Sequence, residues 1–366
     1  MREAQAMKRA LRLALKGAGS VSPNPLVGAV ILKEEQLIAE GYHRKYGENH
    51  AEIEAIKNSM GIDLSGATLV VNLEPCCHTG KTGPCTSAII QKKFAKVIVG
   101  MKDPNPLVSG KGIESLIDAG IDCKVGILEE ECRWVNRIFI HNMTSNLPYM
   151  ILKVAQSIDG CIATSKGESK WITSEVSRKS THKLRAEVDA ILIGRKTASI
   201  DNPFLTVRNV KGRDPKRIII DSKLSLPLTI NAFKKSDRTN TFIICSSEAE
   251  QSRKAETLKL AGIKLIAVES DRDGRLDIKS ALNTLYKEFL VSSILVEGGA
   301  ETYSFMASKN LIDELHVYSA PIIIGNGLHS FSNYKINNMS DAKKMEIVSI
   351  SKSGSDIHTI AVRKND

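Results

Sequence analysis

Aromatic residues are scarce in this sequence, and two other features that would indicate particular partners are missing. Phe, Tyr and Trp make up 5% of the 366 residues, with only 2 Trp. Proteins that bind single-stranded nucleic acid usually stack bases on aromatic side chains interleaved with basic ones, and this sequence has no such motif. It also has no apolar stretch of membrane-spanning length. We therefore expect neither a nucleic acid nor a membrane as a partner.

Basic residues outnumber acidic ones and give a net charge of +10, but they form no run of five or more. Such a charge is typical of nucleic-acid binders and equally of enzymes that act on phosphorylated small molecules. The 7 cysteines are odd in number and irregular in spacing, which argues against a disulfide framework. A reducing compartment suits free thiols, so we expect a cytoplasmic protein.

The length of 366 residues suits two domains. Strand patterns alternate with helix patterns in both halves, which predicts α/β sheets with covered faces. The polar segment 142–148 ends in proline and predicts a linker, so we place one domain at 1–145 and a second at 146–366. A continuous helical pattern from 129 to about 141 precedes that linker.

The basic, amphipathic start of the chain fits two descriptions. Transit peptides for organelles have this composition. Alternatively, a helix over about 2–17 belongs to the first domain, with Met7, Leu11, Leu13 and Leu15 facing inward. We favour the helix, because motif-rich sequence begins directly after it.

His50, Glu52, Cys76 and Cys85 are the most informative residues of the chain. The pattern predicts that His50 and Cys85 begin two helices, and helix N-termini favour thiolates. One His and two Cys hold a catalytic zinc ion with a fourth position open for water, while a nearby Glu moves protons; zinc deaminases have this arrangement. We predict one Zn²⁺ per chain, with Glu52 as the proton carrier in hydrolytic deamination of an amino-heterocycle.

A structural zinc site is the alternative, and it needs four protein ligands. Cys77 or His78 could supply the fourth. However, Cys77 directly follows Cys76, and adjacent residues rarely both reach one ion. Three ligands with an unbound acid favour catalysis.

Three polar residues are candidates for binding the deaminase substrate. Asn24 lies between two prolines that stiffen its segment, and its amide can donate and accept hydrogen bonds as the edge of a pyrimidine does. A plain turn is the alternative for this segment. His43 and His78 fit a pocket wall and a solvated loop equally well.

The second half has no Gly-x-Gly-x-x-Gly after a strand, so a Rossmann fold has no support. Instead, an apolar strand ends at Glu297-Gly298-Gly299 and a helix follows. Backbone N–H groups in such a turn can approach a phosphate, although many strand-to-helix turns contain two glycines.

Taken in order, the motifs of both halves resemble the bifunctional deaminase–reductase family of riboflavin biosynthesis. In the first half they are Pro23-Asn24-Pro25, Gly41-x-His43, His50-Ala51-Glu52, Glu74-Pro75-Cys76, Pro84-Cys85, Lys102-Asp103-Pro104-Asn105-Pro106 and Gly110-x-Gly112. In the second half they are Gln156-Ser157-x-Asp159-Gly160, Trp171-Ile172-Thr173, Arg185-Ala186, Leu205-Thr206-Val207-Arg208, Val296-Glu297-Gly298-Gly299 and Asp313-Glu314. Gly83 and Cys77 depart from the family pattern without removing a predicted ligand.

The resemblance implies a cytidine-deaminase-like three-layer α/β/α domain followed by a dihydrofolate-reductase-like α/β domain that uses NADPH. The first domain is then expected to deaminate a diaminopyrimidinone ribosyl phosphate, and the second to reduce its ribosyl group to ribityl. The NADPH site implied by the resemblance consists of Ala155, Trp171, Thr197, Asp201, Ser222, Gly299, Ala300, Glu301, Thr302, Tyr303, Ser304 and Phe305. Trp171 fits a core position equally well.

Residues for the reductase substrate follow from the same resemblance, and they are Ser169, Arg185, Leu205, Arg208 and Glu297. Arg185 and Arg208 can bind the ribose phosphate bidentately, with surface salt bridges as the alternative. We expect Asp201 to assist proton transfer as the hydride reaches the sugar carbon. We also expect a homo-oligomer.

Two other functions stay open from the sequence. One is a nucleic-acid base deaminase whose second domain binds RNA; steep salt dependence of RNA binding would support it. The other is a non-enzymatic zinc scaffold, which would require four protein ligands.

Overall fold

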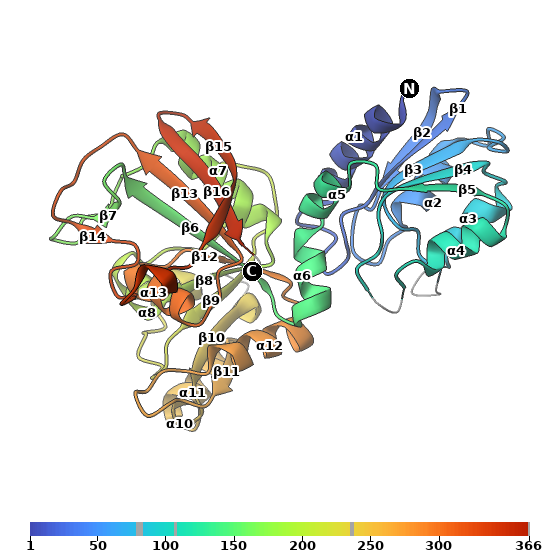
Figure 1. Cartoon of the computed structure of the whole chain (residues 1–366). Coiled ribbons are helices and arrows are strands. Elements are labelled where there is room, and N and C mark those ends of the chain that lie inside the picture. The colour runs from blue at the N-terminus through green and yellow to red at the C-terminus, as the bar shows by residue number, and fades with distance from the viewer. Residues whose placement is uncertain (78–82, 106–107, 235–237, 365–366) are drawn as a thin grey trace. The chain divides into compact units, whose positions relative to one another are not determined.

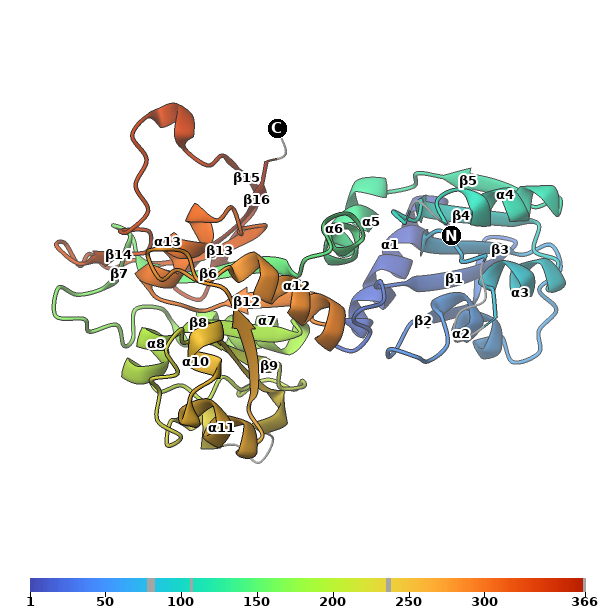
Figure 2. The same ribbon diagram turned by 90° about the horizontal axis from the view of Figure 1, so that it is seen from below.

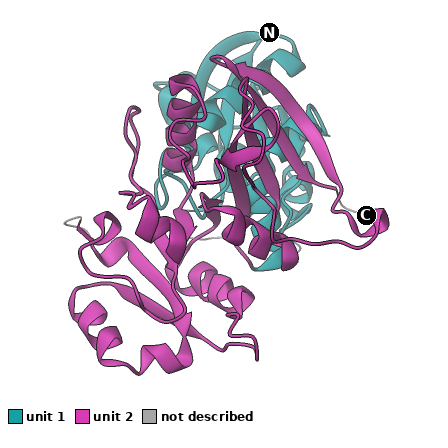
Figure 3. Ribbon diagram, turned by 90° about the vertical axis from the view of Figure 1, so that its left-hand side faces the viewer, with its two compact units in different colours: residues 1–146 teal, residues 147–366 magenta. Residues whose placement is uncertain are grey.

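The computed structural model describes residues 1–77, 83–105, 108–234 and 238–364. The chain divides into two compact units, Met1–Asn146 (unit 1) and Leu147–Asp366 (unit 2), shown in Figures 1 and 3. This division lies one residue beyond the expected boundary. The predicted linker is shorter than 142–148, because helix α6 continues through Ser145 and buries Asn142.

Unit 1 is built on a five-stranded sheet with strand order β2-β1-β3-β4-β5, in which β3, β4 and β5 are parallel and β1 is antiparallel to both neighbours. Its strands are β1 Gly28–Lys33, β2 Gln36–Tyr42, β3 Thr68–Leu73, β4 Lys96–Met101 and β5 Asp122–Val125. Its helices are α1 Glu3–Ala14, α2 Ala51–Asn58, α3 Cys85–Gln91, α4 Lys111–Asp118, α5 Glu129–Val135 and α6 Arg137–Ser145, with a 3-10 turn at Leu15–Gly17.

Two glycines let helices pack directly on opposite faces of this sheet. A Cβ on Gly28 would lie 2.1 Å from the carbonyl oxygen of Ala10 in α1, and one on Gly41 would lie 2.4 Å from the backbone nitrogen of Ala55 in α2. Gly41 pairs with Ala29, the neighbour of Gly28, and successive residues of a strand point to opposite faces. Helices α1 and α2 therefore cover different faces, which makes unit 1 a three-layer α/β/α structure.

The N-terminal helix packs as expected except at its end. Met7, Leu11 and Leu13 are buried, whereas Leu15 is 52% exposed. The prediction for Leu15 was wrong because α1 stops at Ala14 and the tighter 3-10 turn that follows changes the direction of the next side chains.

Unit 2 contains a nine-stranded sheet with strand order β11-β10-β9-β8-β12-β6-β13-β16-β15 (Figures 1 and 2). The first seven strands in that order are parallel, and the C-terminal hairpin β15–β16 adds two antiparallel strands at one edge. The nine strands are β6 Tyr149–Ser157, β8 Ala190–Gly194, β9 Lys216–Ile220, β10 Thr241–Ser246, β11 Lys264–Val268, β12 Ser293–Val296, β13 Glu314–Ala320, β15 Met345–Ser353 and β16 Asp356–Arg363. Strands β7 Cys161–Ala163 and β14 Leu328–His329 form a separate pair.

The helices of unit 2 follow the parallel strands, as the alternation in the sequence predicted. They are α7 Glu175–Glu187, α8 Arg195–Ile200, α9 Asn231–Lys234, α10 Ser247–Glu250, α11 Arg253–Leu260, α12 Ile278–Phe289 and α13 Ala300–Ser308, with 3-10 turns at Arg238–Asn240 and Met339–Asp341. Because the carboxyl ends of parallel strands meet at one edge, the loops after β8, β9 and β12 come together there. In the described part of the chain, no helix has both the length and the apolar character that crossing a membrane requires.

Candidate active sites

The predicted zinc ligands meet where two helices of unit 1 begin. His50 is the N-cap of α2 and Cys85 is the first residue of α3, while Cys76 follows the carboxyl end of β3. Nδ1 of His50 lies 3.3 Å from Sγ of Cys85 and 3.5 Å from Sγ of Cys76. A tetrahedral zinc ion with Zn–S of about 2.3 Å and Zn–N of about 2.0 Å separates its N and S ligands by about 3.5 Å, so this donor set fits zinc.

No fourth protein ligand belongs to this cluster among the residues that the structure describes, and Cys77 is outside it. His78, the other candidate, lies outside the described residues. Between the two thiols, a hydrogen bond from Cys85 lowers the pKa of Cys76 to about 4, and the same pairing raises the pKa of Cys85. This pairing favours the thiolate form of Cys76, the form that binds metals.

Glu52, in the first turn of α2, is buried beside these ligands. Its Oε2 is enclosed and has no hydrogen-bond partner within the described ranges. Burial, followed by the negative charge on Cys76, raises the pKa of Glu52. A buried carboxylate oxygen without a partner is costly to maintain, and its place next to a metal-ligand set suggests that it serves a reacting group.

Of the three predicted residues for binding the deaminase substrate, two lie together. The side-chain amide nitrogen of Asn24 is 3.1 Å from Nε2 of His43, and the His43 ring stands edge-on to the His50 ring with 5.6 Å between centroids. His78 falls outside the described residues here as well. Asn24 and His43 thus adjoin the metal-ligand set, and their roles toward a substrate stay predictions.

A cavity of about 870 Å³ opens in unit 2 at the carboxyl ends of β6, β8, β9 and β12. Most residues of the predicted NADPH and substrate sites line it. They are Ala155, Ser169, Trp171, Thr197, Asp201, Arg208, Ser222, Glu297, Gly299, Ala300, Glu301, Thr302, Tyr303 and Phe305. Trp171 is 73% exposed, so it is not a core residue.

Arg185, Leu205 and Ser304 do not line the cavity among the described residues. All three are buried. Arg185 donates from Nε and Nη2 to the two carboxylate oxygens of Glu297, at 2.6 and 2.7 Å. Its guanidinium is therefore engaged in orienting Glu297, and contact with a phosphate stays a prediction for this residue.

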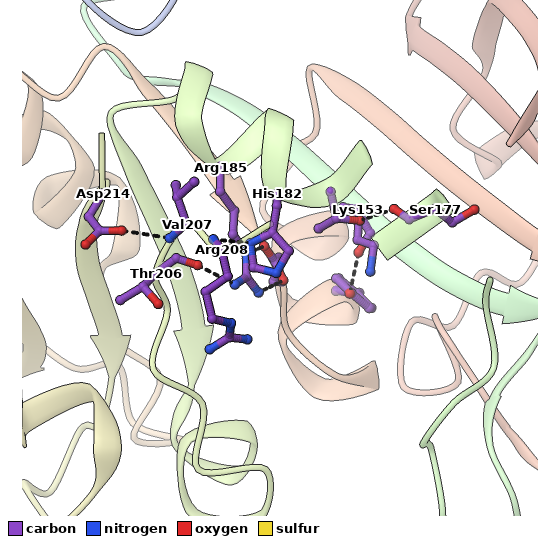
Figure 4. A network of polar contacts seen from close by, with 11 residues as sticks. Lys153, Ser177, His182, Arg185, Thr206, Val207, Arg208 and Asp214 are labelled. Carbon is purple, nitrogen blue, oxygen red and sulfur yellow. Dashed lines mark hydrogen bonds and ion pairs between the residues drawn. The ribbon is translucent and has the colours of Figure 1, made fainter. Parts of the chain in front are cut away.

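Arg208 differs from Arg185, because its guanidinium faces the cavity. In Figure 4 its side chain points away from the network that holds its backbone. Within the described chain, no hydrogen bond or ion pair is found for this guanidinium. A cation without a protein partner at the wall of a cavity suits an anionic ligand.

Comparison with known proteins matches both units. Residues 148–359 match the family model "RibD C-terminal domain", and residues 1–101 match "Cytidine and deoxycytidylate deaminase zinc-binding region". The riboflavin biosynthesis protein RibD of Bacillus amyloliquefaciens is 40% identical over 362 residues, which cover 98% of this chain and 96% of that protein. The chain belongs to the RibD family.

Solved RibD structures agree with this membership. Form 1 of Acinetobacter baumannii RibD superposes with a TM-score of 0.88 at 34% identity and covers 99% of both chains. A deaminase/reductase from Thermotoga maritima gives a TM-score of 0.86 at 38% identity, again with 99% of both chains. The predicted α/β fold class, the zinc-dependent deaminase unit and the NADPH-dependent reductase unit are confirmed. The chain is a bifunctional deaminase and reductase of riboflavin biosynthesis.

Two polar residues at these sites were given no role by the sequence analysis. Lys153 lies in β6 and lines the reductase cavity, where burial lowers its pKa against the opposing charge of Glu297. The sequence feature that could have identified Lys153 was a lysine inside an otherwise apolar strand. Glu74 is buried next to Pro75 and Cys76, and its carboxylate accepts backbone N–H groups from four residues, namely Asp103, Gly110, Gly112 and Ile113.

Glu74 therefore fixes the segment of the predicted zinc ligand Cys76 to the start of α4. The four N–H···O distances run from 2.9 to 3.3 Å. Gly112 completes the contact, since a Cβ there would lie 2.1 Å from the carbonyl oxygen of Pro75. The segment around Gly110 and Gly112 thus holds in place the chain that carries the predicted zinc ligand Cys76.

Proposed function

We propose that unit 1 deaminates a diaminopyrimidinone ribosyl phosphate and that unit 2 then reduces the ribosyl group to ribityl. The Thermotoga maritima relative is named as a diaminohydroxyphosphoribosylaminopyrimidine deaminase and a phosphoribosylaminouracil reductase. The observation that carries the proposal is the unpartnered Oε2 of buried Glu52 beside His50, Cys76 and Cys85.

In the deaminase step, His50, Cys76 and Cys85 would hold a zinc ion, which when bound would supply Lewis-acid activation of the attacking water. Glu52 takes a proton from that water and delivers it to the ring nitrogen. It then takes the second proton from the hydroxyl added to the ring carbon and delivers it to the departing amino group. The carbon–nitrogen bond breaks, ammonia leaves and a carbonyl remains. A raised pKa suits Glu52 to this work, because a carboxyl group that titrates nearer neutrality can both take up and release a proton. Asn24 and His43 hold the pyrimidine edge.

In the reductase step, the residues that line the cavity would hold NADPH, which when bound would supply the hydride for the first sugar carbon. The new carbon–hydrogen bond replaces the bond from that carbon to the ring oxygen, and the ring oxygen takes up a proton. Arg208 holds the ribose phosphate, and Glu297, oriented by Arg185, binds the ring or a hydroxyl. Asp201 is exposed at the cavity and assists proton transfer to the reduced sugar. Gly298 shapes the NADPH site, since a Cβ there would lie 2.4 Å from Cβ of Thr302.

A variant of Glu52 tests the assignment of the two reactions to two sites. Glu52→Ala should retain zinc by elemental analysis and lose ammonia release, while NADPH oxidation with pre-deaminated substrate continues. Mass spectrometry of both products, with and without NADPH, identifies each step. Loss of both activities in a folded, zinc-containing variant would contradict the proposal.

We place the enzyme in a cytoplasm and as a homo-oligomer. Each of the seven cysteines is free, which suits a reducing compartment. Strand β15 is an edge strand on which Ile347, Val348 and Ile350 are exposed, and such an edge can pair with a second copy of the chain. Sedimentation should give an assembly larger than 40.0 kDa that Ile350→Lys dissociates; a wild-type monomer would refute it.

A further inference from the structure

The segment Leu205–Arg208 carries one of the arginines that line the cavity of unit 2, and it lies outside every helix and strand. Leu205 has φ of 53°, a left-handed conformation that leucine rarely adopts. Such a conformation persists only where surrounding contacts hold it. The position of Arg208 therefore depends on side chains that anchor its backbone.

Helix α7 supplies two of these anchors. Nη1 of Arg185 donates to the carbonyl oxygen of Thr206 at 3.0 Å, and Nδ1 of His182 accepts from the backbone N–H of Arg208 at 3.0 Å (Figure 4). His182 and Arg185 are three residues apart, so they share one face of the helix.

A third anchor comes from the return of the chain toward β9. Oδ1 of Asp214 accepts from the backbone N–H of Val207 at 2.7 Å. The return passes close to α7 at Gly212, where a Cβ would lie 2.4 Å from Cβ of Ala186. Thr206, Val207 and Arg208 are thus each held by a different side chain, and His182 holds the residue that faces the cavity.

The environment of His182 keeps its ring suited to this contact. Burial lowers the pKa of His182 to about 4, and the positive charges of Arg185 and Arg208 add to this effect. The charge of Lys153 also lowers the pKa, whereas that of Glu297 raises it. The ring is neutral at physiological pH, so Nδ1 retains the lone pair that accepts the Arg208 N–H. His182 itself is buried and does not line the cavity within the described chain.

We propose that His182 is a positioning residue of the reductase site, which fixes the backbone of Arg208 so that its guanidinium meets the substrate phosphate. This inference rests on the phosphate-binding role proposed for Arg208. It assigns to His182 no contact with substrate, cofactor or reacting atoms.

Two substitutions at His182 separate positioning from packing. Leucine fills similar space without an acceptor, whereas Oδ1 of asparagine can take the place of Nδ1. We expect His182→Leu to raise the KM for pre-deaminated phosphorylated substrate about ten-fold, because the Arg208 N–H loses its partner, with kcat and the KM for NADPH unchanged. His182→Asn should recover most of the KM. After removal of the substrate phosphate, His182→Leu and the unchanged enzyme should have equal KM values.

Controls make the result decisive. Thr181→Val changes the neighbouring buried residue of α7, whose hydroxyl bonds only within the helix to the carbonyl of Ser177, and it should leave every constant unchanged. If Arg208→Ala leaves the KM unaltered, the phosphate role of Arg208 is wrong. If Arg208→Ala raises the KM but His182→Leu does not, or if His182→Leu affects the dephosphorylated substrate equally, the positioning role is wrong.

Discussion

Nε2 of His43 accepts a hydrogen bond from the side-chain amide of Asn24. The nitrogen–nitrogen distance is 3.1 Å, and Nδ1 of the same ring lies 2.9 Å from the carbonyl oxygen of Asn49. A carbonyl oxygen can only accept, so Nδ1 carries the proton and Nε2 presents a lone pair. The His43 tautomer thus fixes which way the Asn24 amide points in the deaminase site.

Replacing Asn24 should damage only the deaminase. We expect Asn24→Asp to lower kcat/KM for ammonia release by about ten- to hundred-fold, because a carboxylate cannot donate to Nε2 of His43. NADPH oxidation with pre-deaminated substrate should not change. Asn58→Asp, on the exposed end of α2, is the matched control and should leave both activities intact. Full ammonia release by Asn24→Asp would show that the pair does not orient the substrate.

The carboxylate of Glu74 should contribute strongly to the stability of unit 1. Glu74→Gln places an NH₂ group where backbone N–H donors converge on each oxygen. We expect the free energy of unfolding to fall by about 2–4 kcal/mol, measured by urea unfolding at fixed zinc concentration. An unchanged unfolding midpoint would mean that water satisfies these N–H groups equally well.

Gly112→Ala tests the same contact between the Glu74–Cys76 segment and the start of α4, this time by changing the residue in α4. The added methyl group would collide with the carbonyl oxygen of Pro75. We therefore expect a lower free energy of unfolding and a lower affinity for zinc. Gly83→Ala is the control, because its Cβ would meet nothing within 4 Å. It should be neutral or stabilising by up to about 1 kcal/mol. Equal effects of the two substitutions would exclude the clash as the cause.

The sequence alone was sufficient to predict that His50, Cys76 and Cys85 come together, because they belong to short motifs at predicted helix starts; their role as zinc ligands stays a prediction. His50 and Cys85 do begin helices, and Cys76 does follow a buried strand. Glu74 could not be assigned in this way, since its partners lie 29 to 39 residues further along the chain. Local patterns contain no information about such a contact.

Distant contacts also explain the error in the predicted helix 129–141 and a pairing in the reductase site that the sequence did not predict. The predicted helix from 129 to 141 breaks at Asn136, whose amide binds the backbone of Leu26, 110 residues away. Arg185 was expected to bind phosphate, and that contact stays a prediction; the structure shows its guanidinium paired with Glu297, 112 residues away. Residue type predicted a cation at the site, but not which of the two arginines faces the cavity.

Removing only the Arg185 charge from the Arg185–Glu297 pair should destabilise the fold more than removing the charges of both partners. Arg185→Leu leaves the buried Glu297 carboxylate without the positive charge that lowers its pKa. We expect a loss of about 3–5 kcal/mol in the free energy of unfolding together with loss of NADPH oxidation. Arg185→Leu combined with Glu297→Gln should recover part of the stability and none of the activity. A stable Arg185→Leu enzyme would mean that the pair is dispensable.

Asp356 joins the C-terminal hairpin to the start of α7, the helix that carries His182 and Arg185. Its Oδ2 accepts from the backbone N–H of Ser174 at 2.8 Å and from Oγ of Ser177 at 2.6 Å. Burial alone would raise the pKa of Asp356, but these hydrogen bonds outweigh burial and lower it. The ionised carboxylate is therefore favoured in the folded state.

This shift predicts how acid affects unit 2. A carboxyl group whose pKa is lower in the folded than in the unfolded chain stabilises the fold above its unfolded pKa of about 3.9, and that contribution disappears as pH falls through the folded pKa. At pH 7 we expect Asp356→Asn to reduce the free energy of unfolding by about 1–3 kcal/mol. The difference between variant and wild type should shrink on acidification below about pH 5. Asp273→Asn, at an exposed turn, should differ little at any pH. A difference for Asp356→Asn that stays constant or widens in acid would show that its charge does not hold α7 in place.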